Sequence, residues 1–232
     1  MAPPLVSVVV PVHNGESYLR ESLDSVLAPG HVALEVIVVD DGSTDSSAAA
    51  AERSGPRVEV HRRQRAGAGA ARNHGVRVAR GAYLAFLDAD DLWTASSLAV
   101  RLEALCADPS VDLVFGHVRH FVSPELDPAR AAQIFCPPEA QPGYVPSCML
   151  ARREAVERVG PFREDLRIGE FVDWMARSRE CGLRDAMVND TVALRRLHGS
   201  NQGIRHRDQR GDFARVVKAA LDRRRLDAAG GA

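Results

Sequence analysis

The sequence predicts an α/β protein in which a mostly parallel β-sheet carries helices on both faces. Short apolar, β-branched runs alternate with helical patterns through the first half of the 232 residues. The run from Leu5 to Val10 is almost wholly apolar, as expected for a parallel strand that is buried on both faces. Acidic clusters directly follow two of these runs, and such sheets bind ligands at the carboxyl ends of their strands.

The first half is expected to contain strands and helices in strict alternation. Hydrophobic patterning predicts strands at 5–10, 34–39, 58–61 and 82–87, and helices at 17–27, 45–54 and 68–79. Asp45 is expected to cap the second helix, and Gly81 follows the end of the third. Because a helix separates each strand from the next, the strands are expected to run parallel.

The second half is less regular. Patterning predicts helices at 98–106, 170–181 and 208–225 and strands at 111–122 and 187–197. The segment 123–144 contains five prolines and is expected to be a loop. The last helix is basic, and a solvated helix face is the favoured interpretation. Docking on an acidic partner, or on the neighbouring subunit of a homodimer, is the alternative. The basic residues concerned are Arg207, Arg210, Arg215, Lys218, Arg223, Arg224 and Arg225.

Composition and charge exclude several classes of protein. Hydrophobic residues make up 45% and charged residues 26% of the chain, which is typical of a globular domain. The formal net charge of −1 gives no overall field that would attract nucleic acid or a membrane surface. The four cysteines form no C-x-x-C pair, and no run approaches the ~18–20 apolar residues of a membrane span. We therefore expect a cytoplasmic protein with reduced thiols, no nucleic-acid partner and no transmembrane segment.

The first acidic cluster, Asp40 and Asp41, ends the second predicted strand. A carboxylate in this position can accept the N3–H of a uracil or the hydroxyl hydrogens of a ribose. The alternative is structural, because the step from Asp41 to Gly42 favours a turn and Asp45 favours a helix cap.

The second acidic cluster, Asp88, Asp90 and Asp91, follows the fourth predicted strand. Carboxylates grouped at a strand end repel each other unless a cation joins them. Mg²⁺ or Mn²⁺ suits this arrangement, because such an ion takes one or two protein carboxylates and completes its shell with phosphates and water. A solvated loop with a helix cap is the alternative.

Four segments together resemble the family-2 glycosyltransferases of the nucleotide-diphospho-sugar transferase superfamily. They read SVVVPVHNGESYLRESLDSVL, VIVVDDGSTDSS, GAGAARNHGVRVARGAYLAFLDADD and GPFREDLRIGE, and the match covers most of 5–200. The resemblance implies the GT-A fold, with a mostly parallel Rossmann-like sheet and an irregular acceptor-side region toward the C-terminus. It implies one domain over 1–205, with a nucleotide-binding half (1–93) and an acceptor half (94–205), and then a helical tail (206–232). The loop at 123–144 is expected to shape the acceptor site.

The resemblance also assigns roles to individual residues. The positions that match the nucleotide site are Pro11, His13, Glu16, Asp41, Arg72 and Asp88. Among them, Asp41 matches the carboxylate that recognises the base, and Asp88 matches the ribose or metal-water position. Asp90 matches the direct ligand of Mn²⁺ or Mg²⁺ in the D-x-D motif. His198 matches a late histidine near the diphosphate or the metal, with a purely structural role as the alternative.

The sequence departs from the family at the catalytic base. The family reads G-E-D-x-D-x-W-x-R, in which the Asp after the Glu takes the proton of the acceptor, and Phe171 stands at that position here. Phenylalanine accepts no proton, so Glu170 is the favoured base and Asp173 the second candidate. The structural alternative pairs Asp173 with Arg177 at i, i+4 on the surface. Another base, an acceptor that needs none, or the absence of transfer are further alternatives.

The resemblance implies sugar transfer from a nucleoside-diphosphate sugar, with UDP favoured, to an acceptor whose identity is left open. The reaction would be an inverting, metal-assisted transfer of the hexosyltransferase type (EC 2.4), and the acceptor a glycan, small molecule, peptide or lipid. A nucleotide-sugar-binding protein that lost its catalytic Asp is the alternative from another class. A nucleotidyltransferase is disfavoured, because the glycine-rich, lysine-bearing phosphate loop of that class is missing.

Overall fold

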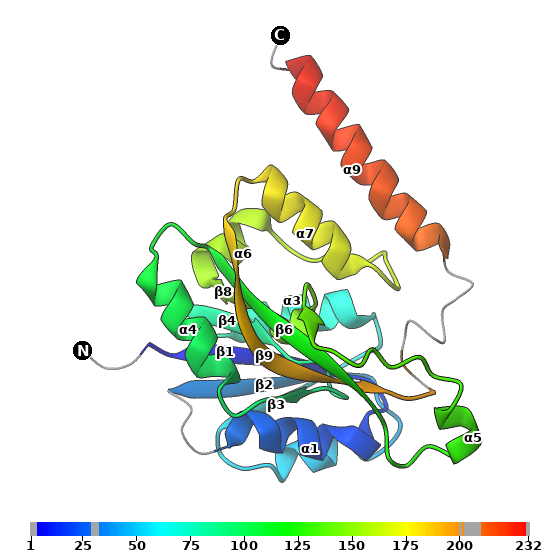
Figure 1. Ribbon diagram of the computed structural model, residues 1–232. Helices are drawn as coiled ribbons and strands as arrows, with labels where there is room; N and C mark the ends of the chain where they lie inside the picture. The colour runs from blue at the N-terminus through cyan, green and yellow to red at the C-terminus, as the bar shows by residue number, and fades with distance from the viewer. Residues whose placement is uncertain (1–3, 29–32, 200, 202–209, 231–232) are drawn as a thin grey trace.

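The protein is described here from a computed structural model, which covers residues 4–28, 33–199, 201 and 210–230 (Figure 1). These residues contain one mixed β-sheet that runs through both predicted halves of the chain. Its strands follow the order β3-β2-β1-β4-β8-β6-β9-β5, and β7 pairs with β6 outside this path. No helix among the described residues is long and apolar enough to cross a bilayer.

The first half has the expected alternation of strands and helices. The elements are β1 (Val6–Val12), α1 (Glu16–Leu27), β2 (Leu34–Asp41), α2 (Ser47–Glu52), β3 (Val58–Arg63), α3 (Ala68–Val78) and β4 (Tyr83–Phe86). Strand β1 pairs in parallel with β2 and with β4, and β2 pairs in parallel with β3. The predicted parallel order of this half is therefore confirmed, with boundaries within a few residues.

Helices cover both faces of this parallel part, because its crossover connections run in opposite directions. The connection from β1 to β2 moves one way along the sheet, and the connection from β3 to β4 moves back across β2 and β1. Right-handed crossovers then place α1 and α3 on opposite faces. Figure 1 shows this arrangement, with α3 packed against β1 and β2. Every residue of β2 and nearly every residue of β1 is buried.

The second half contains short elements that patterning does not predict. Its elements are β5 (Leu92–Trp93), α4 (Ser97–Ala107), β6 (Leu113–Val122), α5 (Pro128–Ala131), β7 (Gln141–Pro142), the 3₁₀ helix η1 (Pro146–Cys148), β8 (Leu150–Arg152), α6 (Arg153–Val159), α7 (Glu170–Glu180), β9 (Asp185–Leu197) and α9 (Arg210–Gly230). The segment at 123–144, expected to be all loop, contains α5 and β7. Strand β8 pairs antiparallel with β4 and β6 and so joins the two halves.

The C-terminal helix α9 lies along α7 (Figure 1). Val216 is buried, Arg215 contacts Asp165, and Arg223 contacts Glu180. One face of α9 therefore docks on acidic residues of the chain itself, whereas the sequence favoured a solvated helix face. Arg207 and the side chains of Arg210, Arg224 and Arg225 lie outside the described residues.

The close approach of α3 to β1 depends on a glycine. A Cβ atom added at Gly75 would overlap the side chain of Val9, reaching 2.9 Å from Cγ2, and Val9 is fully buried. Neither the strand nor the helix can move far, because both belong to the core of the parallel half. Gly211, at the start of α9, has no heavy atom within 4 Å of the same added atom.

We expect Gly75→Ala to lower the free energy of unfolding by about 1–3 kcal/mol, the usual cost of overpacking a core. Gly211→Ala is the matched control and should leave the free energy of unfolding unchanged or slightly higher, because alanine favours helix. Urea unfolding of the two variants measures both effects. An equal stability of Gly75→Ala and the unchanged protein would contradict the close packing of α3 on β1.

Candidate functional site

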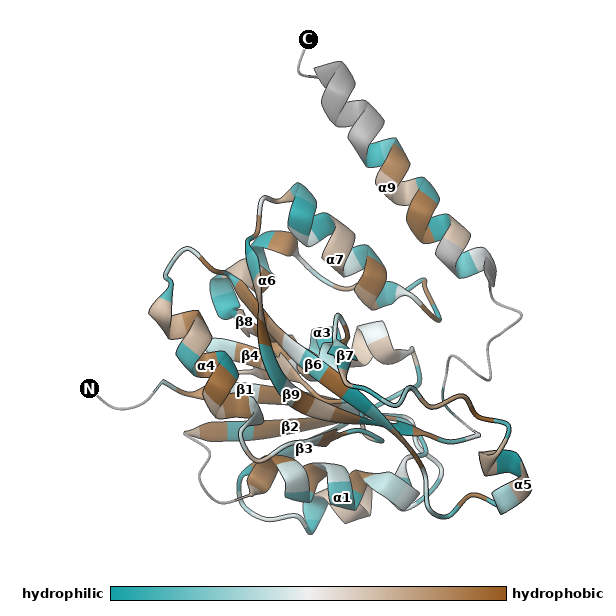
Figure 2. Ribbon diagram, in the orientation of Figure 1, coloured by the Kyte–Doolittle hydropathy of each residue, from teal (hydrophilic) through white to brown (hydrophobic). Residues whose placement is uncertain are grey.

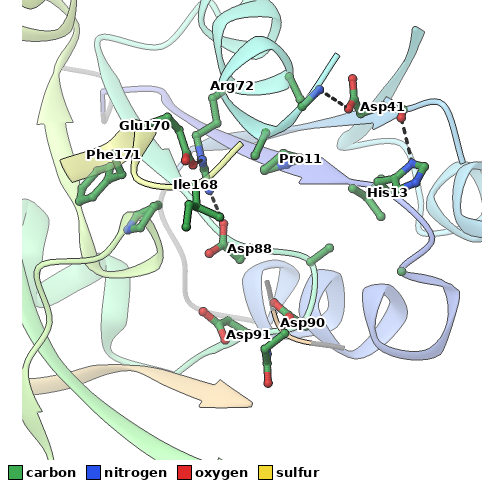
Figure 3. Close-up of a pocket in the computed structure, with 18 of the residues that line it drawn as sticks. Pro11, His13, Asp41, Arg72, Asp88, Asp90, Asp91, Ile168, Glu170 and Phe171 are labelled. Atoms are coloured by element: carbon green, nitrogen blue, oxygen red, sulfur yellow. Dashed lines mark hydrogen bonds and ion pairs between the residues drawn. The ribbon is translucent and has the colours of Figure 1, made fainter. Parts of the chain in front are cut away.

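A pocket of about 810 Å³ opens at the carboxyl ends of the parallel strands. Its walls come from both halves of the chain: the ends of β1 and β2, the start of α3, the segment 88–91, the segment 144–146, the first turn of α7 and the segment after β9. Figure 3 shows how these side chains converge. A volume of this size suits a small-molecule ligand.

One end of the pocket is organised around Asp41. Its carboxylate accepts the backbone N–H of Ala66 (3.0 Å) and of Gly67 (2.7 Å). The Nδ1–H of His13 donates to the Asp41 carbonyl oxygen at 3.0 Å, and Pro11 lies beside it in the wall (Figure 3). A carboxylate has about four lone-pair sites, so Asp41 keeps acceptor capacity toward the pocket. Its orientation is set by the backbone of the turn before α3 and by Arg63, whose Nε lies 3.4 Å from Oδ1.

Glu16 is the one residue of the expected nucleotide site that does not line this pocket. Its carboxylate accepts the N–H of Ser46 at 3.1 Å, and its own N–H donates to Asp45 at 3.1 Å. Asp45 also accepts the N–H of Ser47, the first residue of α2, at 3.0 Å. Glu16 thus ties the loop before α1 to the loop before α2, and its role toward a nucleotide stays a prediction.

Arg72 connects the two sides of the pocket. Its guanidinium reaches Asp88 (Nη2–Oδ1, 2.7 Å) and Glu170 (Nη1–Oε1, 2.5 Å), as Figure 3 shows. Burial by itself lowers the pKa of Arg72, but the charges of Asp88 and Glu170 outweigh it, so the pKa is raised. Arg72 is therefore a permanent cation between a carboxylate of the first half and a carboxylate of the second.

The second acidic cluster divides into exposed and buried members. About a third of the Asp88 and Asp90 side chains is exposed, and both line the pocket. Asp91 is buried and accepts hydrogen bonds from Ser147 Oγ (2.8 Å) and from the N–H of Arg196 (3.2 Å). Burial, and then the charges of its two acidic neighbours, raise the pKa of Asp91 well above its ordinary value. The arrangement leaves Asp88 and Asp90 to face a ligand.

His198 meets Asp90 in the lining of the pocket. The distance from His198 Nε2 to Asp90 Oδ2 is 2.9 Å, and the amide of Asn201 donates to the same oxygen at 3.2 Å. The ring of His198 packs against that of Tyr18, with centroids 4.6 Å apart. Within the described residues, no group of three or more His, Cys, Asp or Glu side chains is arranged to hold a metal. Asp90 and His198 could therefore offer an ion at most two ligands, and other ligands would have to come from a substrate.

The two candidate bases lie in different surroundings. Glu170 lines the pocket beside Arg72, whereas Asp173 is fully buried outside the lining, 2.9 Å from Arg177. The expected pair of Asp173 and Arg177 therefore exists, but in the interior and not on the surface. The ring of Phe171 stacks with Phe162 and Trp174 in the core, with centroids 6.5 and 6.3 Å away. Figure 3 shows this ring pointing away from Arg72.

Sequence reasoning missed several residues that organise the site. Ser147 accepts the N–H of Asp88 and donates to Asp91, and the buried Arg196 donates to the carbonyl oxygen of Asp90 at 3.1 Å. Ser147 stands in no recognisable motif, and Arg196 belongs to the motif RRLHGSN, in which only His198 was given a role. The partners of both residues lie far away in the chain. Asn201 had a signal, because it follows His198 in the motif RRLHGSN.

The amino-acid sequence matches the family model described as Glycosyl transferase family 2 over residues 7–160 of the 232, more than half of the chain. The chain is 32% identical over 185 residues to EpsJ of Bacillus subtilis (strain 168), an uncharacterized glycosyltransferase, covering 72% of this chain and 54% of EpsJ. It is 28% identical over 233 residues to the chondroitin synthase of Pasteurella multocida (strain Pm70), covering 96% of this chain and 24% of that protein. The chain thus spans about half or less of these curated relatives.

Solved structures share the fold. TarS 1-349 of S. aureus in complex with UDP superimposes with a TM-score of 0.71 at 19% identity, covering 95% of this chain and 64% of that chain. The mannosyltransferase PcManGT from Pyrobaculum calidifontis in complex with GDP-Man and Mn²⁺ gives a TM-score of 0.71 at 24% identity, covering 95% of this chain and 67% of that one. The expected GT-A fold, with its mostly parallel sheet, is thereby confirmed. The chain belongs to glycosyl transferase family 2.

Proposed function

We propose that the chain transfers a sugar from a UDP-sugar to an acceptor with inversion, as a hexosyltransferase of class EC 2.4. The observation that carries the proposal is the Arg72 bridge, which sets Glu170 opposite Asp88 in a pocket whose other end holds Asp41. Asp41, the carboxylate that would recognise the nucleobase, and Glu170, the candidate proton acceptor, thus line the same cavity. The identity of the acceptor stays a prediction, whether it is a glycan, a small molecule, a peptide or a lipid. The cytoplasmic location and the formation of a homodimer also stay predictions.

The nucleotide is assigned to the end of the pocket near Asp41. The carboxylate of Asp41 would accept the N3–H of uracil, with Pro11 and His13 lining the base. Small residues at the start of α3, among them Gly67 and Ala71, leave room for the nucleoside. Asp88 would accept hydrogen bonds from the ribose. The diphosphate would then lie toward Asp90 and His198, which also line the pocket.

A divalent cation fits the pair formed by Asp90 and His198. The two side chains offer one carboxylate oxygen and one imidazole nitrogen 2.9 Å apart. Mn²⁺ accepts such a mixed pair more readily than Mg²⁺, which prefers oxygen ligands. The ion would supply positive charge against the diphosphate as it departs. The Mn²⁺ held by PcManGT supports this assignment.

Glu170 is assigned the role of general base. It lines the pocket, whereas Asp173 is enclosed by protein, so Glu170 alone of the two can reach an acceptor that enters the pocket. The acceptor hydroxyl would lose its proton to Glu170 as its oxygen attacks the anomeric carbon, and the diphosphate would leave from the opposite side. Arg72 would keep Glu170 turned toward this point. Such a displacement inverts the anomeric centre.

A second candidate function is nucleotide-sugar binding without transfer. It is favoured by the turn of Phe171 into the core and by the engagement of Glu170 with Arg72, because this contact occupies one of the two carboxylate oxygens that an acceptor would have to reach. The two functions differ in one measurable respect. Only a transferase releases UDP faster when an acceptor is added.

Calorimetry with nucleoside diphosphates tests the donor assignment. UDP should bind more tightly than CDP or ADP, and Asp41→Ala should weaken UDP binding roughly 10–100-fold, the cost of losing a charged hydrogen bond. In the unchanged protein, EDTA should weaken UDP binding strongly. In Asp90→Ala, EDTA should make little difference, because one of the two ligands of the ion is missing.

The matched control for both variants is Asp24→Ala, which removes an exposed carboxylate of α1 that pairs only at the surface. It should bind UDP as the unchanged protein does. Equal UDP affinity with and without Mn²⁺ would refute the metal assignment. A base preference that survives Asp41→Ala would refute the role of Asp41.

Turnover of the Glu170 and Asp173 variants tests the base. Glu170→Gln should lose roughly 10²–10⁴-fold in kcat while UDP affinity stays nearly intact, because one general base contributes this much. Asp173→Asn should cost less, because Asp173 acts on the position of α7 and not on the acceptor. The assay measures UDP release with a panel of acceptors. An inactive Asp173→Asn beside an active Glu170→Gln would reverse the assignment.

A further inference from the structure

The carboxylate of Asp173 is a meeting point of three segments. It is fully buried, and three guanidinium groups surround it: Arg177 of α7 itself (2.9 Å), Arg163 of the loop before α7 (4.0 Å) and Arg223 of α9 (3.5 Å). A buried carboxylate needs such partners, because its charge has lost the stabilisation of water. Withdrawing any one of them therefore loosens the contact among the three segments.

Further contacts tie α9 to the same region. Arg223 also reaches Glu180 near the end of α7, with Nε 2.6 Å from Oε2. Toward the start of α7, Arg215 pairs with Asp165 at 2.5 Å, and Asp212 accepts the N–H of Arg167 at 3.1 Å. Val216 is buried between these polar contacts. Helix α9 therefore holds both α7 and the loop that leads into it.

The segments that α9 holds form the acceptor-side wall of the pocket. Ile168, Gly169 and Glu170 all line it, and they directly follow Arg167. Gly169 has a φ of +82°, so the chain turns sharply just before Glu170. By contrast, Asp41 is held by backbone amides near the start of α3, and in the described part of the chain it makes no hydrogen bond or ion pair with α9. A shift of α9 would consequently move Glu170 and leave the nucleotide end in place.

We propose that α9 is a brace for the first turn of α7, and that Arg223 is a positioning residue that acts on the reaction through Glu170. The proposal rests on the proposed transferase function, since it assigns the brace to the base of that reaction. The proposal gives the basic C-terminal helix a role in turnover. A helix that only faced solvent, or that only bound a partner, would have no such role. Loss of the brace lowers kcat without weakening UDP binding, because small displacements of reacting groups cost much rate.

The test compares Arg223→Gln, Arg223→Lys and the control Lys218→Gln, which removes a positive charge from an exposed position of the same helix. Hydrogen–deuterium exchange over 163–175, the Kd of UDP with Mn²⁺, and the rate of UDP release from UDP-glucose are measured for each. In Arg223→Gln, exchange over 163–175 should rise and kcat should fall roughly 10–100-fold, with the Kd of UDP within about twofold. Arg223→Lys should recover part of the rate, since lysine keeps the positive charge but lacks the planar guanidinium that can donate to two carboxylates at once.

If hydrogen–deuterium exchange over 163–175 is equal in Arg223→Gln and Lys218→Gln, the proposal that α9 braces α7 is overturned. Faster exchange with unchanged kcat would overturn the positioning role, because α7 would then move without consequence. Thermal denaturation of all three variants shows whether a general loss of stability explains a slow variant. A positioning role predicts partial rescue by Arg223→Lys and an unchanged Kd of UDP, whereas a general loss of stability does not. If the unchanged protein releases no UDP from UDP-glucose or from any other UDP-sugar with any acceptor, the proposed function fails, while the exchange comparison still decides whether α9 braces α7.

Discussion

The site depends on one buried cation, the guanidinium of Arg72. It is out of water, and a charge in that position is tolerable only with oppositely charged partners at hydrogen-bond distance. Its partners, Asp88 and Glu170, come from the end of β4 and the start of α7. The chain therefore has to bring these two ends together to satisfy Arg72. The same requirement joins the half that we assign to the nucleotide with the half that we assign to the acceptor.

The two ends of the pocket are held by different means. Around Asp41, two backbone amides, the contact of His13 with the Asp41 carbonyl oxygen and one longer ion pair with Arg63 (3.4 Å) define the geometry at the end of β2. Around Glu170, the position of α7 depends on ion pairs among side chains, some of them contributed by α9. Ion pairs between side chains tolerate substitution less well than backbone contacts, because each removed partner leaves a buried charge. The side that we assign to the acceptor is thus more sensitive to substitution than the side that we assign to the nucleotide.

The parallel half was predictable from the sequence because three of its strands, β1, β2 and β4, are largely buried and read as nearly continuous apolar runs. The acidic clusters were predictable for the related reason that they end those runs. The strands β5, β7 and β8 were not, since two or three residues carry no period. The partners of Arg72 were also out of reach, as were those of Asp173 other than Arg177, because pairs such as Arg72 with Glu170 and Asp173 with Arg223 join positions far apart in the chain. The direction in which the Phe171 ring points depends on its neighbours in the core, which no local sequence pattern reveals.

The most direct test of this account is hydrogen–deuterium exchange with saturating UDP and Mn²⁺, in the unchanged protein and in Arg72→Met. If Arg72 joins the two sides, the ligand should slow exchange over 10–18 and 39–43 in both proteins, but over 168–175 only in the unchanged protein. The same slowing over 168–175 in Arg72→Met would contradict the account, because the two sides would then communicate without their shared cation.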